Sequence, residues 1–175
     1  MAHNLKSISQ PTIDGIKSEW YKQVDAIGDE GAYLYSATDR TVDWCEKVMK
    51  TKETSLLEVC RTNSTVPSAL IEVSDARKSK DPALKLLTIY LAPRLILDCK
   101  ESVSQSELQE ISDIYTDSII FSLKMAHGNG VSKLKIYGRT AEMQSLFDVL
   151  VFNADPESTG ITVKRQGKWL IIDKR

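Results

Sequence analysis

The hydrophobic and polar positions between residues 86 and 137 predict a strand, a helix and a second strand. Residues 86–91 form an almost unbroken apolar and β-branched run, which is typical of a strand buried on both faces. From 106 to 126, apolar residues recur every three or four positions, which indicates a helix. Residues 133–137 alternate between polar and apolar, as in a strand with one solvated face. We therefore predict a right-handed βαβ unit with parallel strands.

The central helix carries signals at both ends and a predicted buried stripe. A capping box can form between Ser104 and Glu107, or alternatively between Ser106 and Gln109. Gly128 or Gly130 can supply the left-handed residue that ends the helix. The stripe expected to face the sheet consists of Leu108, Ile111, Tyr115, Ile119, Leu123 and Ala126.

The rest of the chain predicts further elements on both sides of this unit. Helices are expected at 12–27, with Thr12 as cap, at 38–50 and at 140–152. Strands are expected at 32–36, 55–61, 69–74, 160–165 and 168–173. The strands at 55–61, 69–74 and 86–91 form an antiparallel meander, and the last two strands form a tight hairpin. The inward face of the 140–152 helix is expected to carry Met143, Leu146, Phe147 and Leu150.

Composition and charge narrow the classes of function. The 175 residues fit one domain at 12–175, preceded by an arm at 1–11. The arm is either an ordered extension that docks elsewhere or a loose terminus, and the pattern favours the loose terminus. A net charge of −1 favours neither a nucleic acid nor an anionic membrane as partner. No apolar run is long enough to cross a bilayer or to act as a signal peptide. Cys45, Cys60 and Cys99 form no CxxC pair and indicate free thiols, so we expect a cytoplasmic protein.

This order of elements resembles the GCN5-related N-acetyltransferase (GNAT) fold over residues 12–173, an α/β fold with a mixed sheet. The last helix also resembles a family pattern, through Thr140, Met143, Leu146, Phe147, Val151 and Phe152. The resemblance implies that strand 86–91 splays from strand 133–137 and that an acyl-CoA lies in the gap.

The segment before the central helix departs from that family pattern. The family holds the CoA pyrophosphate on a glycine-containing loop, whose backbone N–H groups approach the phosphates. Residues 93–104 contain no glycine, and Asp98 and Glu101 add negative charge. Arg94 and Lys100 read as structural surface charges. The frequent general acid of the family, a tyrosine, falls at Phe147, which has no hydroxyl group.

These departures favour a non-catalytic protein that acts through protein–protein surfaces and needs no cofactor. The chain is similar to degenerate GNAT-like virion-associated proteins of short-tailed bacteriophages. That similarity implies virion components or a second copy as partners, and the host cytoplasm or the virion as location.

The alternative is an N-acetyltransferase that uses acetyl-CoA with an atypical pyrophosphate loop. The family pattern would then place the cofactor against Tyr90, Leu91, Arg94 and Lys100. Glu72 would be the base for the attacking amine, although an outward-facing strand carboxylate is the simpler interpretation. His3 and His127 are isolated, and no spacing of histidine, cysteine or acidic residues indicates a metal site.

Overall fold

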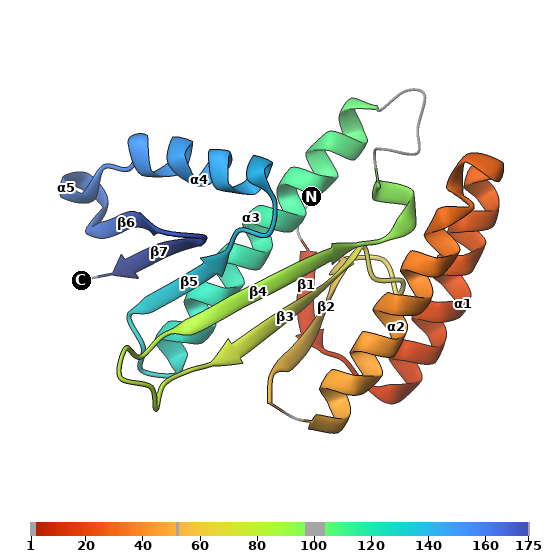
Figure 1. The fold of residues 1–175 in the computed structure, drawn as a ribbon, viewed down its shortest axis with the longest axis horizontal. Helices are drawn as coiled ribbons and strands as arrows, with labels where there is room; N and C mark the ends of the chain where they lie inside the picture. Colours follow the sequence, from red (N-terminus) through yellow and green to blue (C-terminus); the bar gives the residue numbers. More distant parts are fainter. Residues whose placement is uncertain (1–2, 52, 97–103, 175) are drawn as a thin grey trace. The chain divides into compact units, whose positions relative to one another are not determined.

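The computed structural model describes residues 3–51, 53–96 and 104–174. Its strands form a mixed seven-stranded sheet in the order β1-β2-β3-β4-β5-β7-β6 (Figure 1). The elements are β1 (His3–Ser7), α1 (Gln10–Ile27), η1 (Asp29–Gly31), α2 (Tyr33–Thr51), β2 (Ser55–Arg61), β3 (Ala69–Asp75), β4 (Leu84–Leu91), η2 (Pro93–Leu95), α3 (Gln105–Gly128), β5 (Lys133–Tyr137), α4 (Ala141–Phe152), α5 (Pro156–Thr159), β6 (Ile161–Gln166) and β7 (Trp169–Lys174). No helix in the described part of the chain is both long and apolar enough to span a membrane.

The chain divides into two compact units, each with its own set of elements. The first unit comprises Met1–Glu72 and Ile89–Ser118, and the second comprises Val73–Thr88 and Ile119–Arg175. Strands β3 and β4 and helix α3 therefore run from one unit into the other.

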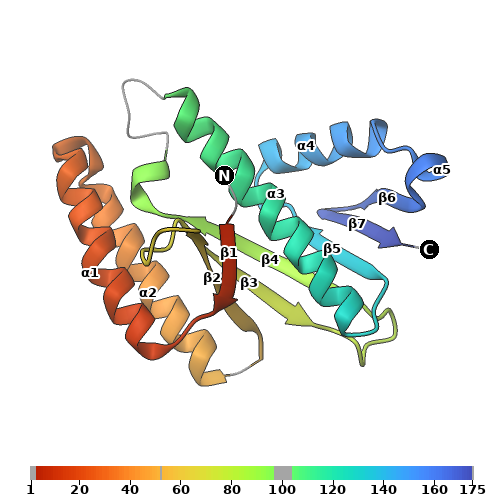
Figure 2. The same cartoon turned by 180° about the vertical axis from the view of Figure 1, so that it is seen from behind.

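In the first unit, α1 and α2 pack against one face of the strands. Their apolar stripes meet side chains of β2 and β3 in a cluster formed by Ile13, Ile16, Trp20, Val42, Cys45, Val48, Leu56, Leu70 and Ala92. Neighbouring side chains of a strand point to opposite faces, so Arg61, five positions after Leu56, lies on the other face. Helix α3 supplies Glu110 to that face, where it meets Arg61. Figure 2 shows α3 from the side opposite to Figure 1.

The N-terminal arm is ordered as strand β1, where the sequence favoured a loose terminus. It pairs antiparallel with β2, from His3 opposite Arg61 to Ser7 opposite Leu57. The backbone of His3 and its Nδ1 atom also contact Oδ2 of Asp117, at 3.1 and 2.9 Å. Backbone pairing at a sheet edge does not require apolar side chains, and this explains why the pattern gave no strand signal.

The prediction of a strand at 32–36 was wrong, because helix α2 begins at Tyr33. Leu34 is buried and lies in helical phase with Thr38, Thr41, Val42 and Cys45, whereas Tyr33 and Tyr35 are exposed. The short run of aromatic and apolar residues looked like a strand, but it is the first turn of the amphipathic helix.

In the second unit, the predicted parallel pair and C-terminal hairpin are confirmed. β4 runs parallel to β5, with Leu84 opposite Leu134 and Leu86 opposite Ile136. β7 pairs antiparallel with both β5 and β6. The hairpin turn uses Gly167 at φ 59°, a conformation that costs glycine little.

Helix α4 buries fewer side chains than the sequence pattern predicts. Thr140 caps it by accepting a hydrogen bond from the backbone N–H of Met143. Phe147 is buried, but Leu146 and Leu150, expected to face inward, are exposed. Phe147 packs so close to Gly138 that a Cβ atom there would lie 2.7 Å from the ring. The exposed apolar residues of α4 are Leu146, Val149, Leu150 and Phe152.

Helix α3 is capped as predicted but buries a different face. Ser104 and Glu107 form the capping box, with the backbone N–H of Ser104 2.9 Å from Oε2 of Glu107. The buried positions step by four residues through Glu110, Ile114, Ser118, Ser122 and Ala126. The predicted stripe is therefore wrong apart from Ala126, and Leu108 is half exposed. Most residues on the buried face are small or polar, so apolar periodicity does not identify this face.

Candidate functional site

The C-terminal half of β4 extends beyond its pairing with β5. The parallel register covers Leu84 to Leu86, while the strand continues to Leu91. Ile89, Tyr90 and Leu91 belong to the extending part, so the residues expected beside the cofactor lie beyond the last pair.

A cavity of about 450 Å³ adjoins this end of β4 within the first unit. Helices α1 and α2 supply one wall, and β4, η2 and α3 supply the rest. The lining residues are Trp20, Leu34, Ala37, Thr38, Arg40, Thr41, Ile89, Tyr90, Leu91, Pro93, Ile96 and Tyr115. The lining is largely apolar, with a few hydroxyl groups and one guanidinium group, a composition typical of small-molecule sites.

The hydroxyl groups of this cavity include Tyr115, which the sequence analysis placed only in an apolar stripe. Burial raises the pKa of Tyr115 above its usual value, so the phenol stays protonated at neutral pH. Neither a carboxylate nor a histidine is among the lining residues. The described lining residues can therefore supply hydroxyl donors, but they include no general base of the usual kind.

Arg94 lies immediately after β4 and is tied to a buried carboxylate on α3. Its Nη1 lies 2.8 Å from Oε2 of Glu110, and its Nη2 lies 2.5 Å from Oε1. Arg61 donates to the same carboxylate through Nε at 2.9 Å and through Nη2. Ser68 adds a third donor to Glu110, at 2.9 Å. Arg94 is therefore part of a buried ion-pair network and not the solvated surface charge that the sequence suggested.

This network keeps Glu110 ionised although its side chain is 1% exposed. Burial alone would raise the pKa of Glu110, but hydrogen bonds from Arg94, Arg61 and Ser68 outweigh it and lower the pKa to about 2. Two arginines thus share one carboxylate, and the group as a whole carries one positive charge. Sequence reasoning missed Arg61 and Glu110, which are 49 residues apart in the chain.

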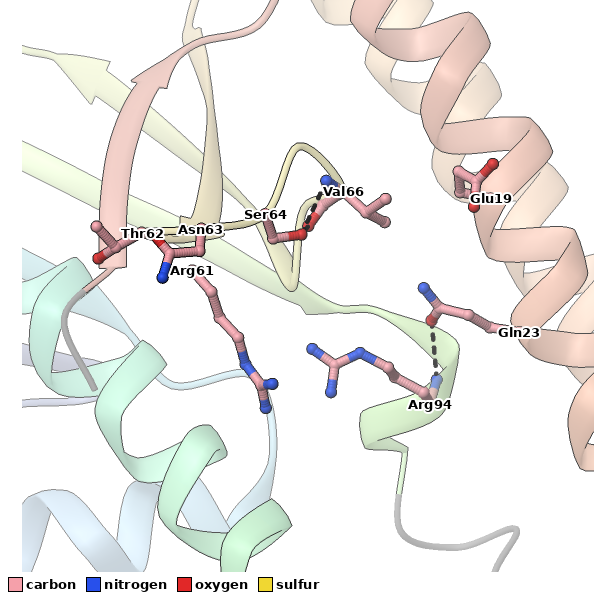
Figure 3. A pocket seen from close by; sticks show the side chains of 8 residues that line it. All are labelled: Glu19, Gln23, Arg61, Thr62, Asn63, Ser64, Val66 and Arg94. Carbon is pink, nitrogen blue, oxygen red and sulfur yellow. Dashed lines mark hydrogen bonds between the residues drawn. The ribbon is translucent and has the colours of Figure 1, made fainter.

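A second cavity, of about 700 Å³, lies next to this network (Figure 3). Its walls come from α1, the loop after β2, and η2, all within the first unit. The guanidinium groups of Arg61 and Arg94 point toward one another in it, and the backbone N–H of Arg94 donates to Gln23.

Glu72 is not among the residues that line either cavity. Glu72 is 9% exposed and accepts a hydrogen bond of 2.8 Å from Thr54, so it is not the outward-facing carboxylate expected. Lys100, Asp98, Glu101 and Cys99 lie outside the described residues.

The described histidines and acidic residues do not form a metal site. His3 is buried against Asp117, while His127 is exposed in the last turn of α3. No group of three or more histidine, cysteine, aspartate or glutamate side chains in the described ranges could hold a metal ion.

Known proteins resemble this chain in structure and not in sequence. No protein-family model and no curated protein matches it. A probable GNAT-family acetyltransferase from Chromobacterium violaceum superposes with a TM-score of 0.55 at 12% identity, covering 99% of this chain and 82% of that one. A tyrosine-to-phenylalanine mutant of the AtaT toxin, bound to the C-terminus of the antitoxin AtaR and acetyl-CoA, superposes with a TM-score of 0.52 at 11% sequence identity. The match covers 99% of this chain and 94% of that one. A tyrosine-to-phenylalanine mutant of KacT superposes with a TM-score of 0.52 at 10% sequence identity, and the match covers 99% of this chain and 96% of that one.

These similarities confirm the predicted GNAT fold. At 10–12% identity they establish the fold alone, because one fold hosts many functions.

Proposed function

We propose that this protein binds acetyl-CoA along β4 and is an N-acetyltransferase with an atypical pyrophosphate site. The observation that carries the proposal is the extension of β4 to Leu91 beyond its last pairing with β5 at Leu86. A strand that continues past its partner offers backbone groups to the amide groups of a pantetheine arm. The adjoining cavity gives the acyl end an apolar place to lie. The AtaT structure with acetyl-CoA supports the proposal by its fold.

The residues present fit the pantetheine arm better than the pyrophosphate. Arg94 already donates to Glu110 and Ser68, so binding a phosphate through the same N–H groups would break bonds to a buried carboxylate. Only the donors of Arg94 outside these bonds, such as Nε, remain for a phosphate. Phe147 is buried and carries no hydroxyl group, so a conventional acid on α4 is absent as well.

Calorimetric titration with acetyl-CoA tests the proposal. We expect saturable binding that weakens at least about tenfold when Ala37→Trp fills the cavity beside β4. The matched control is Ala141→Trp, the same change at an exposed position of the second unit, which should bind like the parent. If millimolar acetyl-CoA gives no saturable heat with the parent protein, the proposal is wrong.

The exposed apolar face of α4 favours a second candidate function, a non-catalytic protein that binds another protein. Phe152 is 88% exposed, and Leu146 and Val149 are each more than half exposed. Contiguous apolar side chains of this kind often mark an interaction surface. The partner proposed from the sequence is a virion component or a second copy of the chain. Self-association through this face can be tested by light scattering, which should show association that Phe152→Ser weakens. A protein that stays monomeric over the accessible concentrations would exclude a second copy as the partner.

A further inference from the structure

The pair of arginines in the larger cavity carries more positive charge than its buried partner neutralises. Glu110 offsets one of the two charges, and the side chains of Arg61 and Arg94 are 39% and 34% exposed. Glu19 also lines the cavity, but Lys22 pairs with it at 2.5 Å. One positive charge therefore remains beside the cavity without a compensating carboxylate among the described residues.

Both guanidinium groups keep N–H donors available. Each arginine has five N–H groups. Arg61 uses Nε and Nη2 toward Glu110, and its Nη1 has no partner in the described part of the chain. Arg94 uses Nη1 and Nη2 toward Glu110 and Ser68, which leaves Nε without a described partner. Because Glu110 holds both groups, Nη1 of Arg61 and Nε of Arg94 are fixed in place for a ligand at little further entropic cost.

Neutral polar groups complete the lining on two sides. Asn63 follows Arg61 on the loop after β2, and its amide has no hydrogen-bond partner among the described residues. Gln23 uses its Oε1 to accept from the backbone of Arg94 at 3.2 Å, so its amide N–H groups stay available. Figure 3 shows Asn63 and Gln23 on either side of the two guanidinium groups.

We propose that this cavity binds the carboxylate group of a small ligand through the unused N–H groups of Arg61 and Arg94. A carboxylate presents two oxygens to a guanidinium edge in a matched geometry. Its single negative charge also balances the single excess positive charge of the network. The site is separate from the proposed acetyl-CoA site, so either proposal can fail without the other.

Titration with sodium succinate, followed by ¹⁵N nuclear magnetic resonance at constant ionic strength, tests the site. We expect saturable shifts of the Nε–H of Arg94 and of the backbone amides of Asn63 and Ser64. Arg61→Gln should raise the dissociation constant about tenfold or more, since it removes the excess charge and a set of charge-assisted donors. Arg61→Lys keeps the charge without the planar edge and should give an intermediate value; it also serves as the folded variant if Arg61→Gln does not fold.

Arg77→Gln provides the matched control, because Arg77 is an exposed arginine that pairs with Asp75 away from the cavity. It should bind succinate like the parent. The site does not exist if succinate gives no saturable shifts, or if Arg61→Gln and Arg77→Gln weaken binding equally. Tighter binding of inorganic phosphate than of succinate at the same residues would overturn the choice of a carboxylate.

Discussion

Glu110 shows how one residue can hold three segments of a chain together. It receives hydrogen bonds from the end of β2, from the start of β3 through Ser68, and from η2. A buried carboxylate is costly unless its lone pairs are satisfied, and here five donor atoms serve its two oxygens. The same contacts occupy Nη1 and Nη2 of Arg94, so Glu110 also determines which donors of Arg94 remain for a ligand.

Glu110→Gln should lower the free energy of unfolding at pH 7 by about 3 kcal/mol, because it removes the ionised partner of two arginines. Urea denaturation of the parent and the variant measures the difference. Arg77→Gln, which removes an exposed ion pair, should change stability by less than about 1 kcal/mol. A similar loss in both variants would contradict a special role for the buried network.

The ion-pair network around Glu110 also predicts that the free energy of unfolding depends on pH. The pKa of Glu110 is about 2 in the folded protein, whereas its ordinary value is 4.5. The ionised carboxylate therefore contributes fully to the free energy of unfolding well above pH 4.5, and this contribution disappears as the pH falls toward 2. About 1 kcal/mol of that contribution should be lost by pH 3.5. The difference in unfolding free energy between the parent and Glu110→Gln should therefore narrow between pH 6 and pH 3.5. A difference that stays constant over this range would exclude the mechanism.

At the level of elements, α3 shows that burial need not follow apolar periodicity. Its buried face carries Glu110, Ser118 and Ser122, and neither serine hydroxyl has a hydrogen-bond partner among the described residues. This face is buried although more apolar residues flank it, and those residues are half-buried or exposed.

Ile114→Asp should unfold the protein or lower its stability by several kcal/mol, because Ile114 is fully buried and an unpaired charge there would be desolvated. Leu108→Asp, on the predicted but half-exposed stripe of the same helix, should stay within about 0.5 kcal/mol of the parent. Thermal unfolding followed by circular dichroism distinguishes the two. The reverse order would restore the stripe predicted from the sequence.

The junction between β5 and α4 depends on a glycine. Gly138→Ala should cost about 1–3 kcal/mol, because its Cβ would meet the buried Phe147 ring at 2.7 Å. Gly15→Ala is the control: it lies inside α1 with nothing within 4 Å of the added atom, and should stabilise by about 0.5–1 kcal/mol. If chemical denaturation gave the same change in the free energy of unfolding for both variants, the Phe147 ring would be able to move away from the added Cβ atom at little cost.

At the scale of the whole molecule, the described thiols report on unfolding. Cys45 and Cys60 are free and buried, at 1% and 3% exposed. Burial raises the pKa of Cys45 to about 12 and also raises that of Cys60. Because the thiolate is the reactive form, neither should react with a disulfide reagent while the protein is folded.

In a Cys99→Ser background, which removes the thiol outside the described residues, Ellman's reagent should release no chromophore at pH 8 until denaturant unfolds the protein. Two thiols should then react. The control is the same variant in full denaturant from the start, which sets the maximum signal. Fast reaction in native buffer would show that the first unit opens without global unfolding.

The sequence by itself determined the elements whose pattern is local. Alternating or continuous apolar runs located β2 to β7 within two residues, and one of the two capping boxes that the sequence offered, Ser104–Glu107, marks the start of α3. The right-handed βαβ rule predicted the parallel pair, and the order of the elements carried the resemblance to the GNAT fold. The absence of glycine between residues 93 and 104 also follows from the sequence alone.

Only the tertiary structure decided which side chains meet. The Arg61–Glu110 and His3–Asp117 contacts join residues 49 and 114 positions apart, and no local periodicity encodes such a pair. The edge pairing of β1 depends on the exposed backbone of β2, and the buried face of α3 depends on how closely it approaches the sheet. Arg94 could be recognised as a candidate from its position after β4, but its commitment to Glu110 arises from the fold, because long-range packing and desolvation set the partner of a charged side chain.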